Sequence, residues 1–142
     1  MIQAAFYTDK SSGSISLKLS GHAGAANKGQ DIICSAASML AYTVAQTAQY
    51  MYADGGLRKK PHIDIADGNA TIVVKPKDDS YAEALHTFFV AQVGFSLLAH
   101  NYPQFVELKS FDLAQESHLQ RTRPPDGQTR TCPPDGLKGE IL

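Results

Sequence analysis

The segment DIICSAASMLAYTVAQTAQYMYADGG (residues 31–56) carries the clearest secondary-structure pattern in the 142-residue chain. Its apolar side chains recur in steps of four and three residues, which places them on one stripe of an α-helix. The stripe consists of Ile33, Ala37, Leu40, Val44, Ala48 and Met51. Asp31 stands at the N-cap position, and Gly55-Gly56 follow the last apolar residue and end the helix. Cys34 therefore falls in the first turn.

Upstream of this helix the sequence predicts a β-hairpin followed by a loop. Residues 2–7 and 15–20 alternate apolar and polar side chains, and the segment between them is polar and contains a glycine, as a turn requires. Residues 21–30 (GHAGAANKGQ) contain three glycines and show no apolar periodicity. We expect this segment to be a flexible loop that orders over a bound substrate, with His22 at its start.

Downstream of the helix a second hairpin is expected. Ile63 and Ile65 alternate with polar residues, Asp67-Gly68-Asn69 is a turn sequence, and residues 70–75 (ATIVVK) are rich in β-branched side chains. Such a sequence is typical of two antiparallel strands joined by a tight turn.

A second helix and a last strand follow. Ser80 and Glu83 form the pattern of a capping box, and the helix that it opens is expected to end near Asn101, before a proline. Its predicted apolar stripe is Leu85, Phe89, Val93 and Leu97, widened by Phe88 and Phe95. Residues 105–111 (FVELKSF) then alternate as a strand.

The predicted element order is therefore β-β-α-β-β-α-β. This order favours an α+β fold in which two helices pack on a largely antiparallel sheet. We assign residues 1–111 to this domain. Residues 112–142 are rich in proline, contain PPDG twice and have few large apolar side chains, so the sequence predicts a disordered C-terminal tail.

The composition and the cysteine spacing argue against several classes of function. Thirteen Lys and Arg balance fourteen Asp and Glu, so we expect no direct nucleic-acid binding. No stretch reads as a membrane span or signal peptide, which suggests a cytoplasmic protein without a membrane partner. The two cysteines, Cys34 and Cys132, lie in segments of different character, and no common zinc spacing occurs. We therefore expect Cys34 to be a free thiol and expect neither a metal nor a cofactor.

Cys34 and His22 are the candidate catalytic pair. The unpaired N–H groups of a helix's first turn favour the thiolate, which is the reactive form of cysteine. The same N–H groups are candidates to stabilise an oxyanion when a carbonyl is attacked, so acyl transfer, including peptide hydrolysis, matches the arrangement. Ser38 lies one turn beyond Cys34 on the same face, where its hydroxyl could bind substrate or the thiol.

The same residues have structural interpretations as well. A free cysteine is commonly an inert core residue, and a histidine after a glycine can simply end a strand. Asp31 fits an N-cap or a third catalytic member, and Ser38 also fits close helix packing. The residues alone leave these alternatives open.

One family combines all of these residues in one motif. It has a Gly-His-Ala segment followed, about a dozen residues later, by Asp-x-[Val or Ile]-Cys and a run of small residues with a serine. The matching positions are Gly21, His22, Ala23, Asp31, Ile33, Cys34 and Ser38. Over roughly residues 1–110 the chain thus resembles the ribosomal-processing cysteine protease family, often called Prp.

The resemblance implies a fold, an activity and a substrate. It implies a compact α+β homodimer, with Cys34 as nucleophile, His22 as its partner and a flexible loop between them. The implied substrate is the extended precursor of a large-subunit ribosomal protein, number twenty-seven. Its N-terminal extension is cut after a hydrophobic, aromatic-containing sequence. The tail has no family counterpart that we can identify.

Two other functions remain as alternatives. One is a non-enzymatic, ribosome-associated binding module in which His22 and Cys34 only support the loop. The other is a thiol-based redox protein, which would require Cys132 to reach Cys34.

Overall fold

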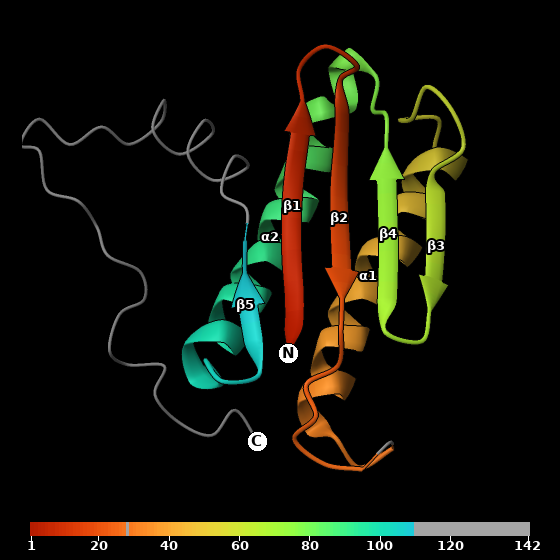
Figure 1. Ribbon diagram of the computed structural model, residues 1–142. Helices are drawn as coiled ribbons and strands as arrows, with labels where there is room; N and C mark the ends of the chain where they lie inside the picture. Colours follow the sequence, from red (N-terminus) through yellow and green to blue (C-terminus); the bar gives the residue numbers. More distant parts are fainter. Residues whose placement is uncertain (28, 110–142) are drawn as a thin grey trace, which may run out of the picture.

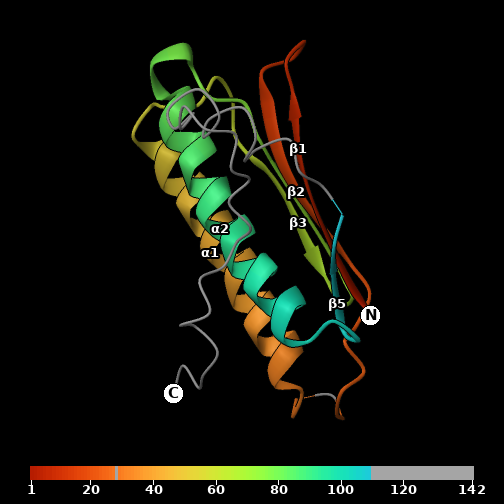
Figure 2. The ribbon, with the colours of Figure 1, turned by 90° about the vertical axis from the view of Figure 1, so that its left-hand side faces the viewer.

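Five strands form one sheet, and two helices cover one of its faces (Figures 1 and 2). The computed structural model describes residues 1–27 and 29–109, so the predicted tail and Cys132 lie outside the described residues. The elements are β1 (Ile2–Asp9), β2 (Ser14–Ser20), α1 (Ile32–Ala53), β3 (His62–Ala66), β4 (Asn69–Val74), the 3₁₀ turn η1 (Asp78–Ser80), α2 (Tyr81–Asn101) and β5 (Val106–Leu108). The predicted α+β class and element order are confirmed.

The strand order in the sheet is β3-β4-β2-β1-β5. Both predicted hairpins are present, and every neighbouring pair is antiparallel except β1 with β5, which is parallel. The last strand is shorter than predicted at its start. The Phe105 N–H donates to the Tyr102 carbonyl oxygen at 2.9 Å, so Phe105 belongs to the turn after α2 and the strand begins at Val106.

The core lies between the sheet and the two helices. Alternate residues of the central strands point inward, and Phe6 of β1 meets Phe95 of α2 edge-to-face, with ring centroids 5.9 Å apart. The predicted stripe of α1 is buried except for Leu40, which is half-buried, and Ala41 and Ala45 join it. Burial of this stripe holds α1 against the sheet.

The predicted apolar face of α2 is confirmed at Phe88 and Phe95, which are buried, but its central stripe is displaced about the helix axis, since Leu85, Phe89 and Leu97 are only half-buried. The buried residues of α2 are Ala84, Phe88, Ala91, Gln92 and Phe95. Val93, a predicted stripe member, is 44% exposed. The two alanines let the helix backbone approach the sheet while the two phenylalanine rings fill the space on either side, so this face packs better than the face with Val93.

The predicted capping box of α2 does not form. Ser80 closes the 3₁₀ turn η1, and its backbone lacks the extended conformation of a capping residue. Its hydroxyl donates to an Asp79 carboxylate oxygen at 3.1 Å and makes no bond to a backbone N–H of the helix. The chain enters α2 through a turn that is already helical.

The expectation about membrane spans also needs a correction. The segment 78–101, which contains α2, is long and apolar enough to cross a membrane by length and composition alone. The core helices of many proteins pass the same test, and α2 packs its phenylalanines into the core.

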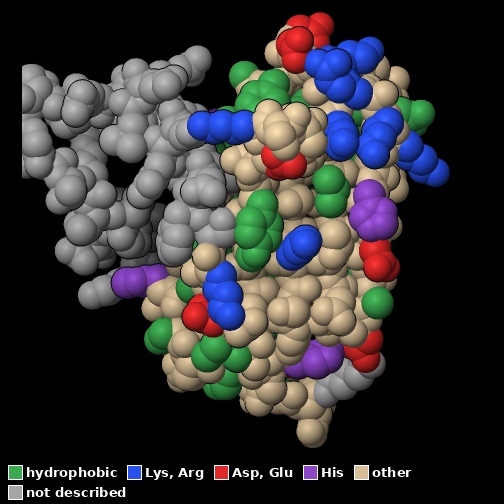
Figure 3. All heavy atoms as spheres, turned by 45° about the horizontal axis from the view of Figure 1, so that its top comes forward, with side chains coloured by type: hydrophobic (Ala, Val, Ile, Leu, Met, Phe, Trp, Pro, Cys, Tyr) green, Lys and Arg blue, Asp and Glu red, His purple; other side chains and the backbone are tan. Residues whose placement is uncertain are grey.

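Lysine and arginine side chains gather at one end of the molecule (Figure 3). Those in the β1–β2 turn, before β3 and after β4 are Lys10, Arg58, Lys59, Lys60, Lys75 and Lys77. Arg58 is paired with Asp78, with Nη2 and Oδ1 2.7 Å apart. This end is opposite the end of the sheet at which β2 runs into the glycine-rich loop.

Candidate active site

Three parts of the chain meet at the end of the sheet where α1 begins (Figure 1). They are the loop after β2, the first turns of α1 and the β3–β4 turn. Together they surround a hollow of about 700 Å³. Its lining includes Ile2, Leu19, Gly21, His22, Gly24, Asp31, Cys34, Ser35, Ser38, Tyr42, Ile65, Asp67, Gly68 and Asn69. The fold therefore brings all five predicted site residues to one cavity.

Asp31 is the N-cap of α1, as one of its two predicted roles required. Its Oδ1 accepts the N–H groups of Ile33 and Cys34, each at 3.0 Å, and its Oδ2 accepts the N–H of Ala25 at 3.0 Å. Asp31 as a whole residue is only 5% exposed. These backbone hydrogen bonds, with that from Cys34 foremost, lower the pKa of Asp31. One side chain thus fixes the start of the helix and one end of the loop.

Cys34 is a free, half-buried thiol in the first turn of α1. The N–H of Ala23 donates to its Sγ at 3.3 Å. Ala23 is buried, so this contact holds the loop over the sulfur. The expectation that first-turn N–H groups are open to an oxyanion is wrong for Ile33 and Cys34, because the Asp31 carboxylate occupies both.

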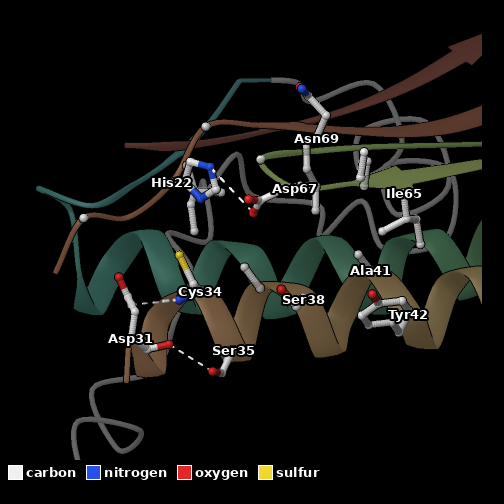
Figure 4. A pocket seen from close by; sticks show the side chains of 18 of the residues that line it. His22, Asp31, Cys34, Ser35, Ser38, Ala41, Tyr42, Ile65, Asp67 and Asn69 are labelled. Carbon is white, nitrogen blue, oxygen red and sulfur yellow. Dashed lines mark hydrogen bonds and ion pairs between the residues drawn. The ribbon is translucent and has the colours of Figure 1, made fainter. Parts of the chain in front are cut away.

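His22 lies across the hollow from α1 (Figure 4). Its ring is exposed, and its Nε2 is 3.9 Å from Oδ1 of Asp67 in the β3–β4 turn. Among the described residues there is no hydrogen bond between His22 and Cys34, although both face the same hollow. Catalytic pairs are often loose in a free enzyme and approach each other when substrate binds.

The two remaining predicted residues have different environments. Gly21 has φ +90°, and a side chain there would collide with the carbonyl oxygen of Met1, so only glycine fits. Its N–H donates to the carbonyl oxygen of Gly68 at 2.8 Å. Ser38 is exposed and lines the hollow one turn beyond Cys34, without a hydrogen bond to the thiol in the described part of the chain.

Sequence reasoning missed the contribution of the β3–β4 hairpin. Asp67 and Gly68 were assigned only to a turn, and Tyr42 and Ile65 were not considered for the site. The sequence carries a turn signal at 67–68, but only the strand order β3-β4-β2 places that turn beside the loop that follows β2.

The arrangement suits nucleophilic catalysis by a thiol. A partly exposed sulfur, a backbone N–H directed at it and an imidazole across the cavity are the groups that acyl transfer from a peptide uses. Within residues 1–27 and 29–109, no three side chains of the His, Cys, Asp and Glu types gather as a metal site would require. The expected lack of metal and cofactor stays a prediction.

Several solved structures of other proteins are similar to this chain. The chain is similar over 78% of its length to solved structures of an essential ribosomal processing protease, Prp, from S. aureus. One of them is in complex with a covalently linked product peptide (20% identity, all of that chain covered, TM-score 0.55) and another with a substrate peptide (20% identity, all of that chain covered, TM-score 0.51). The protein SMU.848 from Streptococcus mutans is similar at 28% identity, over 78% of this chain and 94% of that one, with TM-score 0.55. The comparison with curated proteins returned no match.

A model of a protein family assigns the chain to that family. The model described as "Cysteine protease Prp" matches residues 1–107, which is most of the chain and includes every element from β1 into β5. The match covers the loop with His22 and the helix start with Cys34. This protein therefore belongs to the cysteine protease Prp family and is a cysteine protease.

Proposed function

We propose that this protease removes the N-terminal extension of a large-subunit ribosomal protein, number twenty-seven, with Cys34 as the nucleophile and His22 as the general base and acid. The observation that carries the proposal is that Cys34 and His22 line one hollow, at the start of a helix and on opposite walls. The S. aureus relative is described as a ribosomal processing protease, which supports the same class of substrate here.

The reaction has two steps. The Cys34 thiolate, whose proton has passed to His22, attacks the scissile carbonyl carbon, forming a C–S bond and moving the C=O π electrons onto oxygen. When the carbonyl re-forms, the C–N bond breaks, and the amine leaves with the proton from His22. Water then gives a proton to His22 and attacks the thioester. The C–S bond breaks, the acid product leaves and the thiolate returns.

The Ala23 N–H is the donor that we assign to the oxyanion. It already lies 3.3 Å from Sγ, whereas the N–H groups of Ile33 and Cys34 are engaged by Asp31. The oxygen of a tetrahedral intermediate on Sγ would form close to this donor. The loop that carries His22 would then supply both the base and the oxyanion contact.

A second hollow of about 750 Å³ lies next to the first along α1, and Tyr42 and Ile65 line both. The second hollow is lined by Met39, Tyr42, Thr43, Ala45, Gln46, Thr47, Gln49, Tyr50, Ile63 and Ile65, all of them uncharged. An uncharged groove rich in tyrosine and aliphatic side chains favours a hydrophobic, aromatic-containing peptide. We propose that the part of the extension preceding the cut lies there.

The proposal also covers the localisation, the oligomeric state and the partners of the protein. We propose that the protein acts in the cytoplasm as a homodimer, as the family resemblance implies, without binding nucleic acid or membrane. No Lys or Arg of the described residues lines the active-site hollow, which suits a neutral peptide better than a polyanion. Sedimentation analysis would measure the mass, which should be that of two chains.

Cleavage of the purified precursor tests the proposal. Wild-type protein should shorten the extended ribosomal protein at one bond, as read by intact mass, while Cys34→Ala and Cys34→Ser should leave it whole and keep the wild-type Tm. The two variants should stay folded because a half-buried thiol contributes little to the core. Cleavage by Cys34→Ala at the wild-type rate would refute the mechanism.

Alkylation tests whether the thiol is reactive. Iodoacetamide should modify Cys34 in the wild-type protein, because the sulfur is only half-buried and lines the hollow, whereas a buried structural thiol should not react. Absence of both labelling and cleavage would favour the non-enzymatic binding module. Loss of activity in Cys132→Ser would instead point to a redox role.

A further inference from the structure

The β3–β4 turn makes three separate contacts with the start of the glycine-rich loop. The N–H of Gly21 donates to the carbonyl oxygen of Gly68 at 2.8 Å. The Nε2 edge of the His22 ring lies against Gly68, so closely that a Cβ there would be 2.7 Å from Nε2 and 3.3 Å from Cε1. The carboxylate of Asp67 is 3.9 Å from the same Nε2.

From these contacts we infer that the Asp67–Gly68 turn positions His22 for catalysis. Gly68 leaves room for the Nε2 edge of the imidazole, and Asp67 supplies a negative charge beside the same nitrogen. Both are positioning residues, since they act through His22. The inference deepens the proposed function and rests on it, because it gives the mechanism the group that orients the base.

Asp67 acts by selecting one nitrogen of the ring. When Nε2 carries its proton toward a carboxylate, Nδ1 is left as the basic nitrogen, and it is the one available to the thiol. The distance of 3.9 Å is longer than a hydrogen bond, and both side chains are more than half exposed. The pair therefore adds little to stability, and its effect lies in ring orientation, which tightens when substrate covers the site.

Gly68 acts by having no side chain. Any Cβ at this position would push the imidazole off the turn, since 2.7 Å is well inside the contact distance of carbon and nitrogen. Gly68 also has φ +75°, a backbone conformation that strains any residue with a side chain. A substitution therefore both displaces the imidazole and strains the backbone. Gly13, in the β1–β2 turn, has φ +66° with no atom within 4 Å of its Cβ position, so Gly13→Ala reproduces the strain alone.

The first experiment compares Gly68→Ala with Gly13→Ala in the full-length protein. Gly68→Ala should lower kcat for precursor cleavage by about tenfold to a hundredfold with little change in KM, because ring placement matters in the transition state. Gly13→Ala should lower Tm by a similar amount and leave kcat unchanged. Equal kcat values in the two variants would overturn the role of Gly68.

The second experiment removes the carboxylate. Asp67→Ala should lower kcat about tenfold, and Asp67→Glu should restore it to within about threefold of wild type. Asp64→Ala removes an exposed carboxylate from β3 of the same hairpin and should leave kcat unchanged. An Asp67→Ala variant with wild-type kcat would overturn the role of Asp67.

A spectroscopic measurement separates this inference from the proposed function. The ¹⁵N shifts of the His22 ring, recorded at alkaline pH where imidazole is neutral, show which nitrogen carries the proton. Wild type should favour the proton on Nε2, and Asp67→Ala should move the population toward a mixture. This result does not require cleavage. Altered shifts without any cleavage would support the positioning and refute the protease mechanism, whereas cleavage with unaltered shifts would overturn the positioning alone.

Discussion

The two helices lie side by side on one face of the sheet and are nearly equal in length, with 22 residues in α1 and 21 in α2 (Figure 2). Their first turns differ. The start of α1 is fixed by the buried carboxylate of Asp31, which also binds the loop through Ala25. The start of α2 has no side-chain cap, since Ser80 only closes a 3₁₀ turn. A charged cap is thus present at the helix start that carries the nucleophile.

The faces of the helices differ as well. Helix α2 buries Phe88 and Phe95, while its exposed valines line neither of the two hollows described above. Helix α1 buries mainly alanines and exposes Met39, Tyr42 and Tyr50 toward the second hollow. We conclude that α2 supports the fold, whereas α1 both supports the fold and presents the site. Each prediction below tests this division.

Replacing the histidine of the loop should have the largest effect. His22→Ala should lower kcat by about a thousandfold or more, because the base and the acid of the mechanism are both lost. Precursor cleavage followed by mass spectrometry measures it. His86→Ala, which removes an exposed histidine from α2, is the matched control and should leave the rate unchanged. A tenfold effect or less for His22→Ala would mean that the thiolate needs no partner.

Removing the caps should affect the helices unequally. Asp31→Ala should lower Tm by about 5 °C and also reduce cleavage, because the start of α1 and the loop lose their shared acceptor. Ser80→Ala should change neither quantity measurably, because the Ser80 hydroxyl caps nothing. Differential scanning calorimetry of both variants would decide. Equal Tm values for the two variants would show that the two helix starts contribute equally to stability.

The charge of Asp31 should make this contribution depend on pH. Its pKa is lowered in the folded protein, so the stabilisation is complete above the pKa of the unfolded chain, about 3.9, and is lost as pH falls through the lower folded value. The difference in Tm between wild type and Asp31→Asn should therefore be constant near neutrality and shrink below about pH 4. A difference that grew on acidification would contradict the direction of the pKa shift.

The helices also illustrate what the sequence could predict. Spacing located both helices, and Asp31 was recognisable as a cap because its position precedes a clear stripe. The sequence places Phe88 and Phe95 on the apolar face of α2, as observed, but it also favours Val93, which is exposed, because the two sets of residues fit two rotations of one helix. The roles of Asp67 and Gly68 depend on the strand order, which links residues more than forty positions apart and leaves no local signal.

The exposed faces of the helices should differ in substrate binding. Tyr42→Ala should raise KM for the precursor by about three- to tenfold with kcat nearly unchanged, because Tyr42 lines both hollows and contacts the bound peptide in our proposal. Val93→Ala removes a side chain of similar exposure from α2 and should leave KM at the wild-type value. Equal KM values for the two variants would place the peptide elsewhere.

The smallest effect is expected from removing residues 112–142. This segment follows β5, at the edge of the sheet beside β1, and lies outside the described residues. A truncated protein of residues 1–111 keeps both helices and all five strands, so Tm, oligomeric mass and cleavage rate should match those of the full chain.

The reason lies in the composition of the segment. Proline-rich, mixed-charge sequences rarely offset their ordering entropy, and Leu113 and Leu119 are the main apolar anchors that its first half offers. A strap across a dimer would still be possible with these two leucines. In that case truncation would lower Tm by many degrees or yield monomers, and the tail would contribute to the stability of the fold together with α2. Calorimetry and sedimentation of the two proteins side by side distinguish these outcomes.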